Sequence, residues 1–425
     1  MKILITNATV CDPQSAFNGK KCDLLIRNGI IEDILLSGKK SPEASAKNFD
    51  AKNIFISPGW FDMRAALREP GFEFKEDLVT AAAAAAAGGF TGLACLPTTF
   101  PPIQTKADIE FIRNKSENLP VHIFPLGAIS KNLEGKEMNE LFDMHLAGAV
   151  GFTDGNKTIA DAGLMLRVLM YTKVFGSRIF AHCEDPNISA GGRMHEGGMS
   201  TSLGMKGITP IAEEIIIHRD IELAKYVSAP IHISHISSKG SVEIIRKAKK
   251  QGVPVTCDVA VANLVFTDES LKKFDSNYKL TPPLRSKSDR KALWDGLIDG
   301  TIDCIVSDHH PEDTEHKDVE FEYAAYGMIQ LQTAYSLLNM NAPKNFSDKD
   351  LIRCLSVNPR KILNIEPVKI EKGGRAELTL FDKKRNWKYE SKNNCSRSAN
   401  SPLLNTELKG MAVAILSKDQ FIKNL

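Results

Sequence analysis

Several short apolar segments of the chain end in a side chain that is capable of acid–base or metal chemistry. These side chains are those of Asp154, His182, His235 and Asp308. Imidazole and carboxylate groups are typical zinc ligands, and zinc polarises a carbonyl group and lowers the pKa of bound water. Asp308 is then the candidate general base, which takes a proton from that water. One such residue alone usually only forms hydrogen bonds, but four at the ends of different segments favour a site of catalytic ancestry.

The apolar segments alternate with longer segments of helical spacing, which predicts how the four residues come together. Eight strands that alternate with helices over roughly 250 residues are typical of an α/β fold, the (β/α)8 TIM barrel. In such a barrel the functional site lies at the carboxyl ends of the strands. The predicted strands lie within 54–67, 91–97, 121–127, 148–154, 177–184, 229–236, 253–259 and 302–308, and the clearest predicted helices within 76–87, 159–174, 210–227, 239–250 and 287–297.

His232 and His235 belong to the same predicted strand and must be told apart. Side chains three residues apart on a strand point to opposite faces. His235 is nearer the carboxyl end of the strand, so we expect it to face the barrel axis. We expect His232 to pack beneath the surrounding helices.

Strand character also appears at both ends of the chain, outside the barrel segment. Residues 1–56 and 366–425 are therefore predicted to form one small β domain, a β-sandwich, and residues 57–365 the barrel. Seven consecutive alanines, 81–87, precede Gly88. Alanine has the highest helix propensity and its small side chain lets a helix lie close to a sheet, so this run is predicted to be scaffold.

Composition excludes several classes of protein. Lys plus Arg number 54 and Asp plus Glu 52, which leaves a net charge of +2 and no field that would attract nucleic acid or an anionic membrane. No apolar run approaches the roughly 20 residues that span a bilayer, and no secretory signal is visible. The eight cysteines include no CxxC pair, which argues against a zinc knuckle or a disulfide framework and favours a reduced, cytoplasmic location.

Several motifs resemble those of the class I dihydroorotases, in the amidohydrolase superfamily. The segment SPGWFDMRAALREPGFEFKED, which begins at Ser57, is similar to their opening pattern PG-x-x-D-x-H-x-H-L-R-EPG-x-E-x-KED. AHCED at 181, HISHISSKG at 232, TPPLRSKSDR at 281 and DCIVSDHHPED at 303 match in the same order. The resemblance implies a metal-dependent hydrolase of pyrimidine biosynthesis that interconverts the cyclic amide dihydroorotate and carbamoyl aspartate.

The resemblance also implies roles for individual residues. Arg68 would bind the substrate carboxylate, with Thr98, Thr281 and His309 near the substrate and His310 facing solvent. Asp308 would be the catalytic base. Asp154, His182 and His235 would be metal ligands, able to hold a single outer zinc ion.

The chain departs from the family pattern at residues that would bind the metal or the substrate. Arg64 and Ala66 stand where the family has its H-x-H metal ligands, and a guanidinium has no lone pair to donate to a metal. Thr98 and Thr281 replace asparagines, and Glu312 replaces a histidine. A site built on hydrogen bonds recognises its substrate less well after such losses.

Three hypotheses remain at this point. The chain is an impaired or inactive homologue, a pseudoenzyme that serves as a scaffold for aspartate carbamoyltransferase. Alternatively, it is a working dihydroorotase with a single metal, or a hydrolase of another cyclic amide. The resemblance to the family further implies that the protein is a homodimer. It implies zinc at one site, or no zinc at all.

Overall fold

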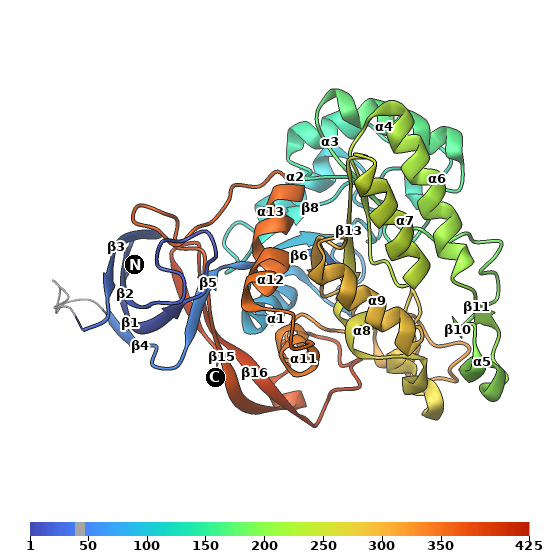
Figure 1. The fold of residues 1–425 in the computed structure, drawn as a ribbon. Coiled ribbons are helices and arrows are strands. Elements are labelled where there is room, and N and C mark those ends of the chain that lie inside the picture. Colours follow the sequence, from blue (N-terminus) through green and yellow to red (C-terminus); the bar gives the residue numbers. More distant parts are fainter. Residues whose placement is uncertain (39–46, 425) are drawn as a thin grey trace.

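Seven parallel strands form the wall of a barrel in two arcs (Figure 1). A computed structural model describes residues 1–38 and 47–424 of the chain. The first arc has the order β6-β7-β8 and the second the order β14-β13-β12-β9. Their bounds are β6 Trp60–Ala65, β7 Phe90–Cys95, β8 His122–Pro125, β9 Ile179–Ala181, β12 Ile231–Ile233, β13 Val255–Ala260 and β14 Cys304–Val306.

Single β-bridges join the two arcs. Phe152 bridges Gly127 on one side and Ile179 on the other, and so takes the place of the fourth strand; Ala65 bridges His309 where the first and last strands meet. The strand predicted within 148–154 is thus reduced to one bridging residue. A Cβ atom on Gly127 would lie 3.0 Å from the ring of Phe152, so this close approach requires glycine.

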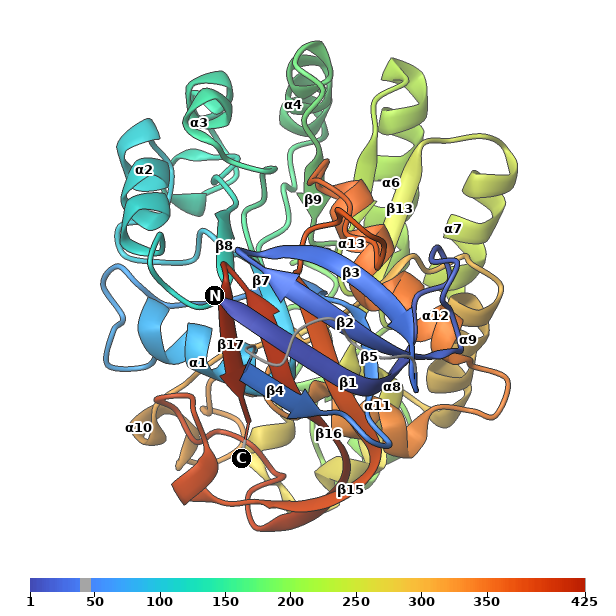
Figure 2. The same cartoon turned by 90° about the vertical axis from the view of Figure 1, so that its left-hand side faces the viewer.

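Helices surround the barrel, and the predicted ones are confirmed to within a few residues at each end (Figure 2). In α1, Asp77 caps the first turn through the backbone N–H groups of Val79 and Thr80. All but two of the alanines in 81–87 are buried against the sheet, and Ala83 is the exposed one. The main helices are α1 Leu78–Gly88, α2 Lys106–Lys115, α3 Leu141–Ala147, α4 Ala162–Val174, α6 Ile211–Val227, α7 Lys239–Lys250, α9 Lys287–Ile298 and α11 Ala334–Asn341.

Shorter helices lie between these elements. They are α5 Gly198–Leu203, α8 Val261–Val265, α10 Thr314–Lys317, α12 Asp348–Ile352 and α13 Asn358–Ile362. Two short strands, β10 Met194–His195 and β11 Gly207–Ile208, pair with each other in the long connection between β9 and α6. In the described parts of the chain, no helix is both long and apolar enough to cross a membrane.

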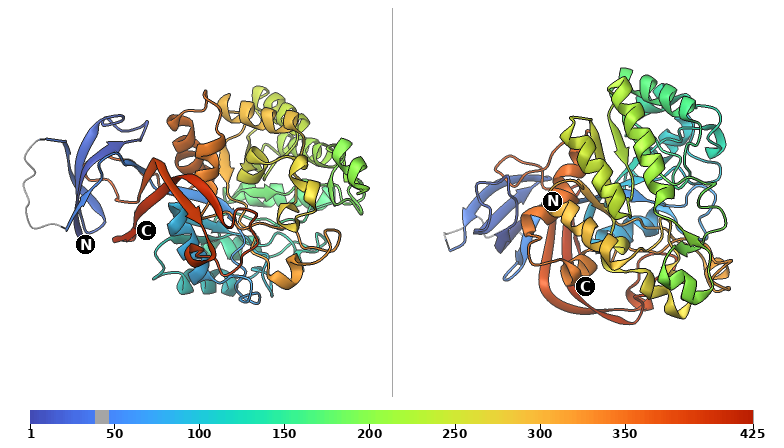
Figure 3. Two further views of the ribbon diagram at one scale, coloured as in Figure 1. Left: turned by 90° about the horizontal axis from the view of Figure 1, so that it is seen from below. Right: turned by 45° about the vertical axis from the view of Figure 1, so that its right-hand side comes forward.

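Strands from both ends of the chain form a second sheet beside the barrel (Figure 3). Its order is β17-β16-β15-β5-β1-β2-β3, with β4 paired to β1. One face of this sheet has its own apolar core, which includes Leu24 and Ile26. The bounds are β1 Lys2–Val10, β2 Lys21–Arg27, β3 Ile30–Leu36, β4 Lys47–Asp50, β5 Phe55–Pro58, β15 Leu378–Tyr389, β16 Thr406–Ser417 and β17 Gln420–Lys423.

Candidate functional site

Arg64 lies at the centre of the barrel mouth. Its side chain is 2% exposed, and its Nε donates a hydrogen bond to Oδ1 of Asp308 at 2.9 Å. Nη2 donates to the backbone oxygen of Gly155 at 3.3 Å and to the side-chain oxygen of Asn156. One guanidinium therefore joins the end of β6, the loop after Phe152 and the residue that follows β14.

Asp308 is held as a charged carboxylate by its neighbours. Burial alone would raise its pKa, but His235 and the positive charge of Arg64 together hold the pKa of Asp308 well below its ordinary value. A carboxylate that is already paired with a guanidinium is a weak base for a water proton. The candidate base is thus present in the mouth, with one oxygen engaged by Arg64.

The imidazole rings of His182 and His235 form a hydrogen bond with each other. Nδ1 of His182 lies 2.8 Å from Nε2 of His235, so one imidazole donates a hydrogen bond to the other. Nδ1 of His235 lies 3.7 Å from Oδ2 of Asp308. Burial lowers the pKa of both histidines, and the charge of Arg64 lowers it further. Both rings are therefore neutral at pH 7.

His232 was expected to pack beneath the helices, and this is wrong: its neighbours Ile231 and Ile233 face the helices, whereas its ring lies 4.9 Å from that of Phe180 inside the barrel. The alternation does not extend to His235, because β12 ends at Ile233.

The side chain of His232 is fully buried, and Nε2 lies 2.8 Å from Oδ2 of Asp258. The other oxygen of Asp258 accepts a hydrogen bond from the backbone N–H of His235 at 2.6 Å. The pair supports the strand end that carries His235.

Asp154 uses both of its oxygens within a neighbouring loop. Oδ1 accepts hydrogen bonds from the backbone N–H groups of Ile129 at 2.8 Å and Ser130 at 3.0 Å, and Oδ2 accepts one from the Ser130 hydroxyl. Burial raises the pKa of this carboxyl group. These contacts order the loop after β8 and engage both oxygens of the carboxylate.

The donor groups in the mouth do not fit the metal centre that the motifs suggest. Two imidazoles are bonded to each other, one carboxylate is bonded to Arg64 and the other to Ser130. Within residues 1–38 and 47–424 there is no group of three or more His, Cys, Asp or Glu side chains that could hold a metal ion. The guanidinium also brings a positive charge to the place where a second cation would have to bind.

Arg68 is bound by a carboxylate of the chain itself. Its backbone has a φ of 65°, and its buried side chain donates from Nε to the backbone oxygen of Pro311 at 3.0 Å. Nη2 donates to Oε1 of Glu312 at 2.5 Å, and the second oxygen of Glu312 accepts from Nζ of Lys75 at 2.5 Å. The predicted substrate contact is thus paired with Glu312.

The two histidines after Asp308 have different surroundings. His309 is buried, and its Nδ1 accepts a hydrogen bond from the backbone N–H of Gln330 at 3.1 Å. His310 was expected to face solvent, and this is wrong: its side chain is 14% exposed and its Nε2 lies 3.7 Å from Oε1 of Glu312. The backbone of His310 is held on both sides, because its N–H donates to the backbone oxygen of Met328 at 2.9 Å and its own oxygen accepts from Asn400 at 3.0 Å.

Thr98 and Thr281 lie in loops at the mouth. The hydroxyl of Thr98 is buried and has no hydrogen-bond partner among the described residues. Its methyl group lies 2.3 Å from where a Cβ atom on Gly155 would be, which places it against the loop that Arg64 contacts. Thr281 precedes Pro282 and is partly buried. Neither residue is among the ionic contacts of the mouth.

The chain is similar in sequence to known proteins over nearly its whole length. Residues 53–241 match the family model described as Dihydro-orotase-like. The chain is 40% identical over 424 residues to a dihydroorotase from Syntrophus aciditrophicus and 39% identical to one from Geobacter sp., with 99% of each chain covered in both cases. The chain belongs to the dihydroorotase family.

Solved structures confirm the fold of this family member. The L-hydantoinase from Arthrobacter aurescens superimposes with a TM-score of 0.86 at 23% identity, over 99% of this chain and 95% of that one. The dihydropyrimidinase from Brevibacillus agri gives a TM-score of 0.84 at 21% identity, over 100% and 95%. The predicted amidohydrolase-type TIM barrel with a sheet of terminal strands is therefore confirmed.

Three residues of this dihydroorotase-family mouth were given no role from the sequence, although Asp62 and Lys75 fall on fixed positions of the opening pattern. Asn156 and Lys75 bind Arg64 and Glu312, as described above. Asp62 is fully buried and accepts a hydrogen bond from the backbone N–H of Ser307 at 2.9 Å; burial raises its pKa to about 7. The signal for Asp62 and Lys75 was their place in that pattern, as the D of PG-x-x-D and the K of KED, and Asn156 had no such signal.

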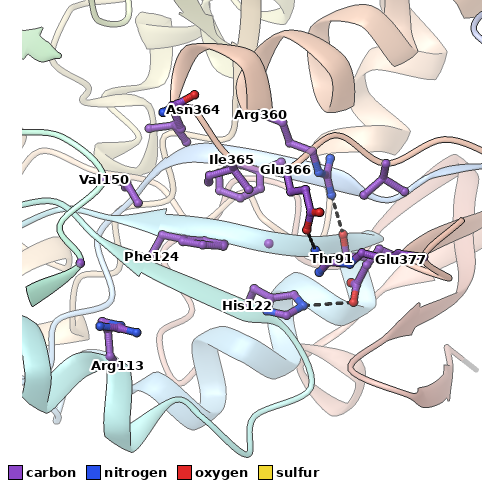
Figure 4. Close-up of a pocket in the computed structure, with 16 residues that line it drawn as sticks. Thr91, Arg113, His122, Phe124, Val150, Arg360, Asn364, Ile365, Glu366 and Glu377 are labelled. Carbon is purple, nitrogen blue, oxygen red and sulfur yellow. Dashed lines mark hydrogen bonds and ion pairs between the residues drawn. The ribbon is translucent and has the colours of Figure 1, made fainter. Parts of the chain in front are cut away.

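A separate cavity of about 510 Å³ lies at the opposite end of the barrel, where the strands begin (Figure 4). Phe124 and Val150 contribute apolar surface. On its polar side, Nε2 of His122 lies 3.1 Å from Oε1 of Glu377, and Arg360 donates to the hydroxyl of Thr91 at 3.2 Å. The first contact joins β8 to Glu377, the residue just before β15, and the second joins α13 to β7 within the barrel. Residues at this end of a TIM barrel serve stability rather than catalysis.

Proposed function

We propose that this dihydroorotase-family chain is a pseudoenzyme, impaired or inactive in hydrolysis, which acts in pyrimidine biosynthesis as a partner or scaffold of aspartate carbamoyltransferase. The observation that carries the proposal is the buried ion pair between Arg64 and Asp308. The pair engages the candidate base and introduces a fixed positive charge among the candidate metal ligands. The loss of the H-x-H pattern in an otherwise complete fold supports a retained structural role.

The electrostatics of the mouth support this proposal. Two like charges a few ångströms apart in a poorly solvated site repel each other strongly, and Arg64 is 2% exposed. Binding of a zinc ion near His182 and His235 would require the guanidinium to leave or the ion to bind elsewhere. The two imidazoles are bonded to each other, while the buried Nδ1 of His235 has no hydrogen-bond partner among the described residues.

The names of the curated relatives favour a second candidate, a working dihydroorotase. Relatives at about 40% identity over nearly the whole chain carry that name. In this candidate His182, His235 and a carboxylate hold one zinc ion, after Asp308 or Asp154 is released from its present partner. The remaining alternative is a hydrolase of another cyclic amide, and no residue of the chain identifies that substrate.

Metal content and ring opening, measured on the same preparation, distinguish these candidates. The pseudoenzyme is expected to contain well under one equivalent of zinc after purification without chelator, and to show no zinc-dependent hydrolysis of dihydroorotate. One equivalent of zinc together with zinc-dependent ring opening would contradict the proposal and establish the second candidate. Ring opening of another cyclic amide alone would establish the third.

Restoring the two missing imidazoles tests the role of Arg64 directly. The double variant Arg64→His with Ala66→His is expected to gain zinc, because it removes the guanidinium and adds two ligands. Arg246→His, at the surface ion pair with Asp299, is the matched control and is expected to gain none. A double variant that folds and still binds no zinc would show that Arg64 is not what excludes the metal.

The partner role has its own test. The purified chain is mixed with aspartate carbamoyltransferase and analysed by size-exclusion chromatography with light scattering. We expect a homodimer alone and a larger complex in the mixture. Separate elution at micromolar concentration of both proteins would contradict the scaffold part of the proposal, and a monomer would contradict the dimer.

A further inference from the structure

Arg360, in α13, is a buried cation that donates its hydrogen bonds to neutral groups. The residue is 6% exposed. Nη1 donates to the backbone oxygen of Gly59 at 2.6 Å and to that of Ser356 at 3.2 Å, and Nη2 donates to the Thr91 hydroxyl at 3.2 Å. Within the described residues, no carboxylate accepts a hydrogen bond from Arg360, and its Nε has no acceptor. Buried charges are usually paired, so this guanidinium is available to an anion.

Two carboxylates line the same cavity of about 510 Å³ as Arg360, and both already have partners (Figure 4). Oε1 of Glu377 lies 3.1 Å from Nε2 of His122, and Glu366 forms an ion pair with Arg375. Burial lowers the pKa of Arg360 to about 10; the charge of Glu377 opposes this change and the like charge of Arg375 adds to it. Arg360 is therefore still charged at pH 7, and no carboxylate of the described chain neutralises it by contact.

The rest of this cavity offers apolar surface. Phe124, Val150 and Ile365 are half-buried and pack against the apolar cluster that includes Phe61. The centroids of the Phe61 and Phe124 rings are 5.5 Å apart, and the guanidinium carbon of Arg360 lies 5.7 Å from the centroid of the Phe61 ring. Small-molecule sites typically have volumes of about 300–1,000 Å³, mostly apolar walls and a few polar groups. The cavity has this composition, with the cation beside the aromatic wall.

Arg113 brings a second cation to the cavity, well apart from Arg360 (Figure 4). Its Nη1 donates to the backbone oxygen of Ala147 at 2.6 Å, and the residue is exposed. Water screens an exposed charge, so a ligand gains less from Arg113 than from the buried guanidinium. The cavity therefore has one strong position for an anion, at Arg360.

We infer that this cavity is a binding site for a small organic anion with a flat apolar body, such as an aromatic carboxylate. The carboxylate accepts a hydrogen bond from Nε of Arg360, and the aromatic body lies against Phe124 and Val150. Arg375 and Glu377, which precede β15, line the same cavity, so the ligand contacts both the barrel and the small domain. The site lies at the opposite end of the barrel from the mouth, so it goes beyond the proposed function and does not depend on it.

The probe for this site is 2-naphthoate, because it joins one carboxylate to a flat aromatic body. Isothermal titration calorimetry of the full chain is expected to show saturable binding, with a Kd below about 1 mM. The alcohol 2-naphthalenemethanol has the same body without the charge. It is expected to bind at least about tenfold more weakly, because a hydrogen bond between charged groups is lost. Ionic strength is kept constant with chloride.

Arg360→Gln removes the buried charge. It is expected to weaken the binding of 2-naphthoate at least about tenfold, while the affinity for the alcohol changes less than about threefold. Arg113→Gln is the matched control, since Arg113 lines the same cavity from an exposed position. We expect it to change the affinity for either compound less than about threefold.

Val150→Trp tests the location of the site without removing a charge, which keeps the test decisive if the Arg360 variant does not fold. The indole fills the apolar part of the cavity, so both compounds are expected to lose measurable binding. Val174→Trp, at the exposed end of α4 and outside this cavity, is the control and is expected to bind both compounds like the unsubstituted protein. No saturable binding of 2-naphthoate, equal affinity for the acid and the alcohol, or unchanged binding of 2-naphthoate in Arg360→Gln or Val150→Trp would overturn the inference.

Discussion

At the scale of single residues, the mouth depends on the replacement of a metal-binding pattern by one guanidinium. Arg64 satisfies Asp308, Gly155 and Asn156 together, which one imidazole could not do. The sequence predicted that Arg64 could not bind a metal. It could not predict that the guanidinium would reach Asp308, 244 positions away, because that contact depends on closure of the barrel between its first and last strands.

The first prediction concerns the stability of this pair. Arg64→Met keeps much of the side-chain volume but leaves Asp308 charged and without its partner. We expect a loss of about 3–5 kcal/mol in the free energy of unfolding, the usual cost of breaking a buried pair. The measurement is equilibrium denaturation in urea at pH 7.

The control for that experiment is an exposed pair of the same chemistry. Arg246 contacts Asp299 at 2.8 Å, with exposed fractions of 30% and 43%. Arg246→Met is expected to cost about 0–1 kcal/mol. Equal losses in the two variants would mean that Asp308 finds another partner, and would weaken the argument that Arg64 defines the mouth.

At the scale of elements, pattern and propensity predicted most of the fold. The helices and seven of the eight barrel strands follow from periodicity in the sequence, because each is a local consequence of side-chain order. A fourth strand was predicted within 148–154, but its pattern does not show that only Phe152 forms bridges. The burial of His310 left no local signal, because its backbone bonds to Met328 and Asn400, which are distant in the sequence.

The second prediction tests the close packing of α1. Ala82 is fully buried and Ala83, one residue on, is exposed. Ala82→Leu adds three carbon atoms to a packed contact and is expected to cost about 1–3 kcal/mol. Ala83→Leu changes the helix propensity by the same amount, and we expect it to leave the free energy of unfolding nearly unchanged. The Tm of each variant is compared by calorimetry, and similar values for both would contradict the packing argument.

The third prediction concerns the contact between His122 of β8 and Glu377, the residue just before β15. Burial alone would raise the pKa of Glu377, but the hydrogen bond with His122 holds it below its ordinary value. A depressed carboxyl pKa contributes stability above the pKa of the unfolded chain, and this contribution is lost as the pH falls. Lys418 also donates its backbone N–H to Glu377 at 3.2 Å, and Arg360 acts on it through charge.

Glu377→Gln is therefore expected to lower the free energy of unfolding by about 1–3 kcal/mol at pH 7. The difference from the unsubstituted protein should shrink as the pH falls through the ordinary carboxyl range. Glu366→Gln, at the exposed pair with Arg375 beside the same cavity, is the control and should have little effect at any pH. A difference that grows towards acid pH would have the wrong sign for this mechanism.

At the scale of the whole molecule, the barrel and the small domain share one strand. Along β16, Leu408, Ala412 and Ile415 belong to the apolar core of the barrel, whereas Val413 and Leu416 belong to the core of the small domain. β16 therefore contributes side chains to both cores. Separation of the domains would expose apolar surface on both, so we expect them to unfold in one cooperative transition.

The fourth prediction follows from that sharing. Leu24 is fully buried in the small-domain core, while Trp60, Trp294 and Trp387 lie in or against the barrel core. Leu24→Ala is expected to cost about 2–5 kcal/mol. Because the transition is shared, tryptophan fluorescence must shift to a lower unfolding midpoint by the same amount as far-UV circular dichroism. An unchanged fluorescence midpoint would show that the barrel unfolds independently, and that β16 does not couple the two cores.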